Sequence, residues 1–178
     1  MMMDVVMEIM NYTGENGPFI LFSSSIFLLW NKEKLLFYHI SGSCLNLILN
    51  VFLKLWIKQP RPSDDKHKFE LAMKQSNLYL FFNHYNYDVF GMPSGHAQAV
   101  VFLSVFLFMS NPTFAVRMFY IIIALITMWQ RVQYEHHNIL QVFVGALVGG
   151  LFALFMFYMS QMNISGPLRE KPDDDAPL

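Results

Sequence analysis

The chain has 178 residues, of which 54% are hydrophobic and only 14% are charged. This composition is too apolar for an ordinary soluble domain of this length and predicts a protein of the lipid bilayer. The formal net charge of -1 argues against nucleic acid as a partner, because a basic field is needed to hold a polyanion. The single cysteine, Cys44, excludes a disulfide framework or a thiolate metal site within one chain.

The first segment, residues 1–17, has an amphipathic pattern. Val5 and Ile9 fall on one helical side, opposite Asp4 and Glu8. This pattern favours a short helix lying on the membrane surface, and a flexible tail is equally compatible with it. The segment contains no Lys or Arg and so lacks the basic start of a cleavable signal peptide; we expect it to be retained.

Five apolar segments follow and predict an all-α, integral-membrane bundle of about five transmembrane helices. A span needs about 20 mainly apolar residues, and three of the five segments are shorter than that. The second carries His39, Asn46 and Asn50, which must face other helices rather than lipid. In the fifth, Gly145 and Gly149 form a close-packing face. The segments cover residues 18–30, 35–57, 96–109, 114–129 and 139–159.

Polar stretches interrupt and follow these segments. Residues 58–95 form a long insert, in which the mixed residues 69–83 favour a helix at the membrane surface. The end of the chain contains three consecutive aspartates and predicts a solvated, disordered tail. The expected organisation is an N-terminal segment of residues 1–17, a membrane domain of residues 18–160 and a tail of residues 161–178.

Counting five spans places three polar junctions, and the N-terminus, on one side of the membrane. The first junction carries Lys54 and Arg61, seven residues apart at the end of the second segment. Arg61 can fork onto phosphate oxygens, and Lys54 can add a point charge. Taken alone, the same pair is also explained by basic side chains that snorkel at a membrane boundary.

The second junction ends a loop and starts the third apolar segment with the sequence Pro93-Ser94-Gly95-His96. A helix N-terminus attracts anions through its free backbone N–H groups, Ser94 adds a hydroxyl, and Gly95 lets the backbone approach closely. His96 is placed to donate a proton to a leaving oxygen. The alternative is a simple capping turn followed by an interfacial histidine.

The third junction contains Arg131, His137 and Gln141. Residues four apart on a helix share a face, so Gln141 can fix the tautomer of His137 and leave its other ring nitrogen to attack phosphorus. Arg131 would hold the phosphoryl group, although a polar loop without a catalytic role is the alternative. The histidines and Glu135 of this region show none of the usual metal-ligand spacings, so we expect no metal and no cofactor.

The three junctions resemble, in order and in spacing, the signature motifs of the type 2 phosphatidic acid phosphatase superfamily. The matching residues are Lys54-x6-Arg61-Pro62, Pro93-Ser94-Gly95-His96 and Arg131-x5-His137. The resemblance implies a compact bundle of membrane helices and metal-independent hydrolysis through a phosphohistidine. It assigns the nucleophile to His137 and the general acid to His96. It assigns phosphate binding to Lys54, Arg61, Ser94, Gly95 and Arg131.

Two positions depart from the usual third motif. Gln130 stands where the family has a serine, and Gln141 stands where it has the aspartate that polarises the nucleophile. An amide in place of that carboxylate can lower the rate by about 10⁴ when it enforces the wrong tautomer. Gln141 avoids this loss only if its carbonyl oxygen accepts from His137. A lipid-phosphate-binding protein with weak or no turnover therefore stays open as an alternative.

Further residues resemble the dolichyl-diphosphatase branch of the superfamily. This closer resemblance implies a polyisoprenyl diphosphate substrate, an endoplasmic reticulum membrane and a site that faces the lumen. Phosphatidic acid or another lipid monophosphate is the alternative substrate. The expected partners are thus a lipid phosphate or diphosphate and the membrane, without nucleic acid. The branch-like residues are Gly91-Met92, Ala97-Gln98, Lys58-Gln59-Pro60 and Gln141-Val142.

Overall fold

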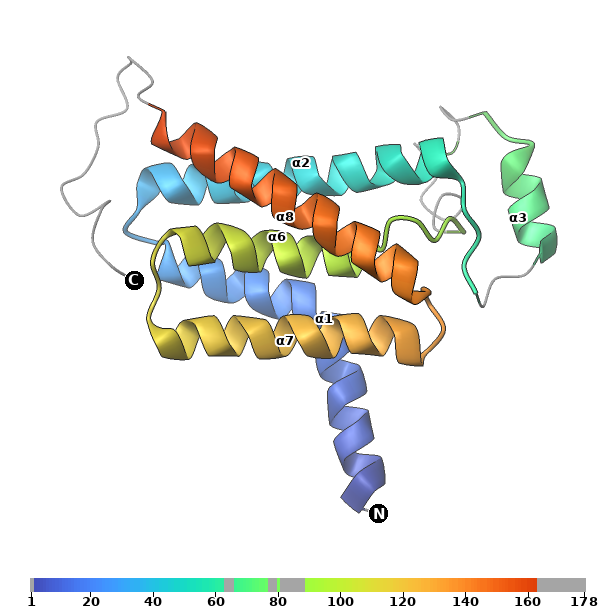
Figure 1. Cartoon of the computed structure of the whole chain (residues 1–178), viewed down its shortest axis with the longest axis horizontal. Coiled ribbons are helices and arrows are strands. Elements are labelled where there is room, and N and C mark those ends of the chain that lie inside the picture. The colour runs from blue at the N-terminus through green and yellow to red at the C-terminus, as the bar shows by residue number, and fades with distance from the viewer. Residues whose placement is uncertain (1, 63–65, 77–79, 81–88, 163–178) are drawn as a thin grey trace.

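The computed structural model describes residues 2–62, 66–76, 80 and 89–162. The expected acidic tail beyond residue 162, and much of the helix expected over residues 69–83, lie outside this part of the chain. Within it, the named elements are all helices, as the sequence predicts (Figure 1). They are α1 (Met2–Leu28), α2 (Glu33–Ile57), α3 (Lys66–Met73), α6 (Gly95–Met109), α7 (Phe114–Gln133) and α8 (Ile139–Gln161).

The bounds of α2, α6, α7 and α8 lie close to those of the predicted spans. Among the described helices, α2, α7 and α8 are long and apolar enough to cross a membrane, and α6 is apolar but shorter. α1 is not in this group, and its N-terminal half carries Asp4, Glu8 and Glu15. The structure therefore supports a membrane helical bundle, in which three helices meet the requirements of a span by themselves.

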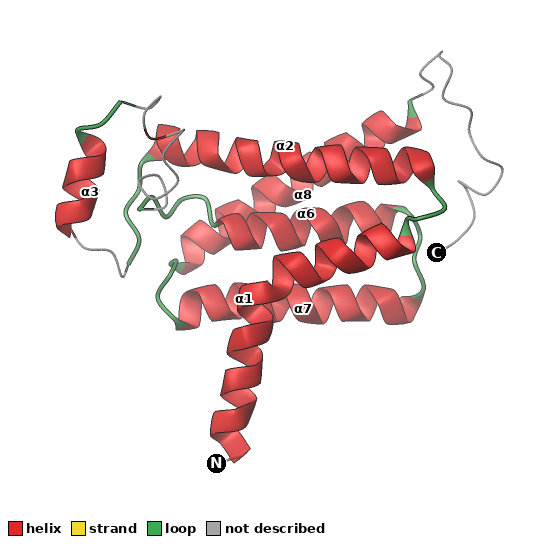
Figure 2. Cartoon of the chain, turned by 180° about the vertical axis from the view of Figure 1, so that it is seen from behind, coloured by secondary structure: helices red, strands yellow, loops and turns green. Residues whose placement is uncertain are grey.

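α6 is the central helix of the bundle. It packs against α1, α2, α7 and α8, and α8 and α1 lie on opposite sides of it (Figures 1 and 2). Its side chains are mainly apolar all round, as expected for an enclosed helix, and Phe102 and Phe106 are completely buried. The surrounding helices turn large apolar side chains outward, among them Phe52, Ile122 and Leu151, which suits contact with lipid.

α8 crosses α6 at the two glycines that the sequence predicts as a close-packing face. A Cβ atom at Gly145 would lie 2.5 Å from the carbonyl oxygen of Ser94. A Cβ atom at Gly149 would overlap the carbonyl oxygen of Gln98. Backbone atoms cannot move aside as side chains can, so this crossing requires glycine. It brings the N-terminal ends of α6 and α8 together.

We expect Gly149→Ala to destabilise the protein by about 1–3 kcal/mol, because the added methyl group meets backbone. Gly150→Ala is the matched control, since a Cβ atom there would lie 3.6 Å from the Val101 side chain, an ordinary contact. That variant should be neutral or stabilising by up to about 1 kcal/mol, because alanine favours helix over glycine. Thermal unfolding in detergent compares the two, and equal melting temperatures would contradict the tight crossing.

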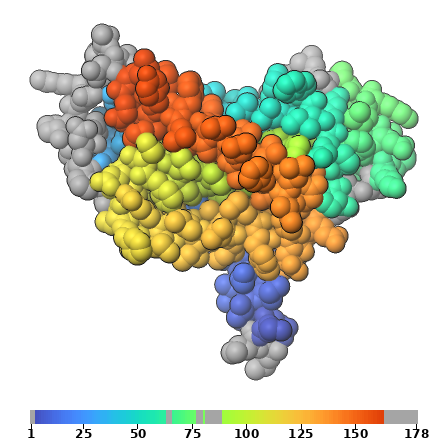
Figure 3. Space-filling model, viewed as in Figure 1, coloured from blue at the N-terminus to red at the C-terminus, as the bar shows by residue number. Residues whose placement is uncertain are grey.

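α1 is one continuous helix, although its N-terminal half was expected to form a separate segment. It contains Pro18, and an internal proline kinks a helix. The first turns of α1 leave the bundle at a large angle (Figures 2 and 3). Near the bend, Gly14 and Gly17 lie so close to α7 that Cβ atoms there would overlap Gln130 and Thr127. The expected domain boundary thus falls inside a packed helix.

The described part of the polar insert, which includes α3, lies at the end of the bundle where α2 ends (Figure 1). Its helix α3 packs through Phe69 and Ala72 onto Leu55 and Phe90, which form a small second core. α3 begins and ends earlier than the helix expected over residues 69–83.

Candidate active site

A cavity of about 500 Å³ lies at the end of the bundle where α2 ends and α6 and α8 begin. Its lining includes Lys54, Arg61, His96, Arg131 and His137, which come from all three junctions singled out in the sequence. The prediction that these junctions lie on one side is therefore confirmed. The fold also places α1 along this cavity, through Glu15 and Asn16.

The cavity carries an excess of positive charge. Lys54 and Arg131 are 4% and 7% exposed, and Arg61 is partly buried. Among the described residues that line the cavity, Glu15 is the one carboxylate. Charged groups removed from water are stabilised by opposite charge and by charge-assisted hydrogen bonds. Three cations against one carboxylate therefore favour an anion with more than one negative charge, such as a phosphate.

Ser94 occupies the N-cap position of α6, but its side chain does not cap the helix. Its hydroxyl oxygen is fully buried and has no hydrogen-bond partner in the described part of the chain, whereas Gly95 beside it lines the cavity. This arrangement favours a ligand oxygen over a simple capping turn. The N–H group of Ser94 donates to the carbonyl of Gln141 at 3.0 Å, so it is not one of the expected free amides.

Buried amides hold this turn in place. Asn50 Nδ2 donates to the carbonyl of Pro93 at 3.2 Å and to Gln98 Oε1 at 2.8 Å. Gln98 Nε2 in turn donates to Asn46 Oδ1 at 2.8 Å. The prediction that polar residues of α2 face other helices is confirmed for these two asparagines and for His39, which contacts Ser25 Oγ at 2.6 Å. The supporting role of Asn50 was not predicted, although its polar side chain in an apolar run is a visible signal.

Gln141 lies completely buried behind His137. Its Nε2 donates to the carbonyl of Pro60 at 2.9 Å and to Gln59 Oε1 at 3.0 Å. Its Oε1 accepts from the backbone N–H of Asn138 at 3.2 Å and lies 3.3 Å from His137 Nδ1. A backbone carbonyl only accepts and a backbone N–H only donates, so these two groups fix the orientation of the amide. The acceptor end therefore faces Nδ1, which favours the tautomer with the ring proton on Nδ1 and an unprotonated Nε2.

The environment of His137 also keeps its ring neutral. Burial lowers the pKa of His137 to about 3, and the charges of Arg61 and Lys54 act in the same direction. Hydrogen bonds to Gln141 and to the backbone of Gly91 oppose this shift without cancelling it. A neutral imidazole with a free nitrogen is the form that can act as a nucleophile.

Gln130, the other departure from the family motif, orients Arg131. Arg131 Nε donates to Gln130 Oε1 at 2.5 Å, and Gln130 Nε2 donates to Asn11 Oδ1 at 2.7 Å. These bonds connect the guanidinium to α1. The backbone N–H of His137 donates to the carbonyl of Arg131 at 3.0 Å and closes the turn between α7 and α8. This contact of Asn11 was not predicted.

The cavity thus contains six of the eight predicted site residues, and the other two, Ser94 and Gln141, lie directly behind it. Among the described residues, no three His, Cys, Asp or Glu side chains gather closely enough to hold a metal ion. Glu15 and Asn16 were not predicted, because the sequence places them in a separate N-terminal segment. Gln59 was not predicted as a site residue either.

The family model of the PAP2 superfamily matches residues 35–165, which include all three junctions. Searches of curated proteins and of solved structures return no match. Members of the superfamily are phosphatases that act on lipid phosphates. A cationic cavity at one end of a membrane bundle is consistent with that activity. Because the match covers well over half of the sequence, the chain belongs to the PAP2 superfamily.

Proposed function

We propose that this protein hydrolyses a polyisoprenyl diphosphate of the dolichyl type through a phosphohistidine formed on His137. The observation that carries the proposal is the orientation of Gln141, whose Oε1 lies 3.3 Å from His137 Nδ1. This contact favours the tautomer with an unprotonated Nε2, the one form of the neutral ring that can attack from that nitrogen. Membership of the superfamily supports the broader activity on lipid phosphates.

In the proposed reaction, Lys54, Arg61 and Arg131 bind the phosphoryl oxygens and neutralise their charge. Nε2 of His137 forms a bond to the terminal phosphorus, and the bond from that phosphorus to the bridging oxygen breaks. His96 gives a proton to the leaving oxygen. Water then attacks the phosphohistidine and returns a proton to His96, which releases inorganic phosphate and free His137. Each step uses side chains of this chain, so we propose that the reaction needs no metal.

The diphosphate substrate is supported by the residues that resemble the dolichyl-diphosphatase branch. Gln59 accepts from Gln141 Nε2 at 3.0 Å. Gln98 accepts from Asn50, whose Nδ2 also donates to the carbonyl of Pro93 in the turn before α6. The branch-like glutamines therefore hold parts of the candidate site. The same resemblance adds an endoplasmic reticulum membrane and a lumen-facing site to the proposal. Phosphatidic acid is the rival substrate, because the cations bind a monophosphate by the same chemistry.

The test compares phosphate release from polyisoprenyl diphosphate and from phosphatidic acid by the purified protein, in detergent with a chelator present. We expect chelator-resistant release, with kcat/KM for the diphosphate at least about tenfold higher, which corresponds to about 1.4 kcal/mol of differential transition-state binding. A preference for phosphatidic acid would overturn the proposed substrate. Release from neither lipid would favour the lipid-phosphate-binding alternative.

A further inference from the structure

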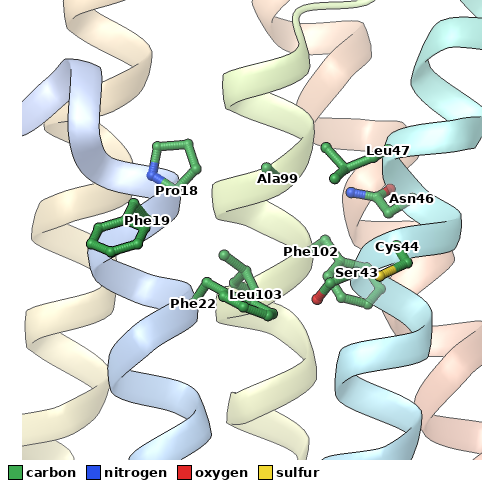
Figure 4. Close-up of a pocket in the computed structure, with 10 residues that line it drawn as sticks. All are labelled: Pro18, Phe19, Phe22, Ser43, Cys44, Asn46, Leu47, Ala99, Phe102 and Leu103. Atoms are coloured by element: carbon green, nitrogen blue, oxygen red, sulfur yellow. The ribbon is translucent and has the colours of Figure 1, made fainter.

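A second cavity, of about 350 Å³, adjoins the cationic cavity of about 500 Å³ described above, which we call the phosphate cavity. The two share the lining residues Pro18, Phe19, Leu47 and Ala99, so they lie side by side. The side chains of the second cavity come from α1, α2 and α6, and α6 lies between the other two helices (Figure 4). Most of these side chains are apolar, unlike the cationic lining of the first cavity. We call this second cavity the apolar groove.

The apolar groove runs along the bundle, away from the phosphate cavity. On α6, His96 lines the phosphate cavity, Ala99 lines both cavities, and Leu103 lines only the groove. These three residues are spaced as one face of a helix. On α1, Asn16 lines the phosphate cavity, Phe19 lines both, and Phe22 lines only the groove. On α2, which runs in the opposite direction, the same order is given by Lys54, Leu47 and Cys44. On all three helices, the change from polar to apolar lining therefore occurs at the same level of the bundle.

The apolar groove is open on its outer side. Phe19 and Leu47 are 71% and 59% exposed, and Cys44 is also exposed, whereas Phe102 on α6 is completely buried and forms the floor. Since α2 is long and apolar enough to span a membrane, its exposed residues at this depth face lipid chains. An occupant can thus have its head in the phosphate cavity and its apolar part at the depth of the bilayer interior.

We propose that the apolar groove binds the hydrocarbon chain of the lipid phosphate substrate next to its phosphate, an inference that rests on the proposed function. The chemistry of the two cavities selects this occupant. The cations hold the phosphate head, and apolar side chains remove the first part of the chain from water or from competing lipid. Because the groove is open along its outer side, the rest of a long chain continues into the bilayer.

The first test narrows the groove with Cys44→Trp. The matched control is Leu45→Trp, because Leu45 is the adjacent residue of α2, is 48% exposed and lines neither cavity. We expect Cys44→Trp to lower kcat/KM for polyisoprenyl diphosphate by at least about tenfold, since part of the chain loses its apolar site. Hydrolysis of inorganic diphosphate, which has no chain, should stay unchanged in both variants. Equal changes in kcat/KM for polyisoprenyl diphosphate in Cys44→Trp and Leu45→Trp would overturn the proposal. An equal loss of activity toward the lipid and toward inorganic diphosphate in Cys44→Trp would also overturn it.

The second test measures binding without turnover. A long-chain alkyl phosphate with a diazirine in its chain, photolysed with the full-length protein in detergent, should label groove residues such as Leu47 and Leu103. Unlabelled polyisoprenyl diphosphate should compete this labelling away, and Cys44→Trp should reduce it. Competed labelling without any hydrolysis would overturn the proposed function and keep the groove. Hydrolysis with labelling confined to outward residues such as Phe52 would overturn the groove and keep the function.

Discussion

Replacing His137 with alanine should abolish phosphate release, with a fall in kcat of at least about 10⁴-fold. The side chain lines the phosphate cavity with three cations, and among the described residues no other histidine contacts Gln141. The measurement is steady-state phosphate release in detergent with a chelator. His67→Ala is the control, because His67 is exposed on α3 and lines none of the cavities described above, and this variant should keep native activity.

The same pair of variants tests the covalent intermediate. With a substrate labelled in its terminal phosphate, rapid quenching under alkaline conditions should leave label on the native chain and on His67→Ala. His137→Ala should carry none, because a phosphoramidate bond cannot form. Label that persists on His137→Ala would assign the nucleophile to another residue. Activity that survives in this variant would contradict the phosphohistidine mechanism itself.

The helices could be predicted from the sequence because their signals are local. Apolar runs of the right length are bounded by polar residues, as at Asn111-Pro112 before α7 and at Asn138 before α8. The close-packing face of α8 was also visible, because glycines four residues apart in an apolar helix allow another helix to approach closely; that this helix is α6 was not predicted. The gathering of the three junctions followed from counting spans.

The supporting contacts of the site could not be predicted, because they join residues that are distant in sequence. The orientation of Gln141 depends on Gln59 and Pro60, which precede it by more than seventy positions. The role of Asn11 depends on a helix that continues through Pro18, where local rules favour a break. Tertiary packing decides both features, and a single sequence carries no pairwise signal for either.

Gln141→Met should lower kcat by about 10²–10⁴-fold, because the thioether cannot accept from His137 Nδ1 as Oε1 does and the ring then loses its preferred tautomer. Gln141→Glu should lose less activity, since a carboxylate oxygen can still accept from His137 and from the N–H of Asn138. Its second oxygen, however, faces the carbonyl of Pro60, so some loss remains. Thermal unfolding of both variants separates loss of fold from loss of chemistry.

The pH dependence distinguishes a tautomer defect from a protonation defect. Burial lowers the pKa of His137 to about 3, so the ring is neutral above about pH 5 in the native protein. The hydrogen bond to Gln141 raises this pKa, so its removal lowers the pKa further and cannot create a charged ring. The ratio of Gln141→Met to native kcat/KM should therefore stay constant between about pH 5 and about pH 8. A ratio that rises with pH would show that Gln141 acts on the protonation of His137 and not on its tautomer.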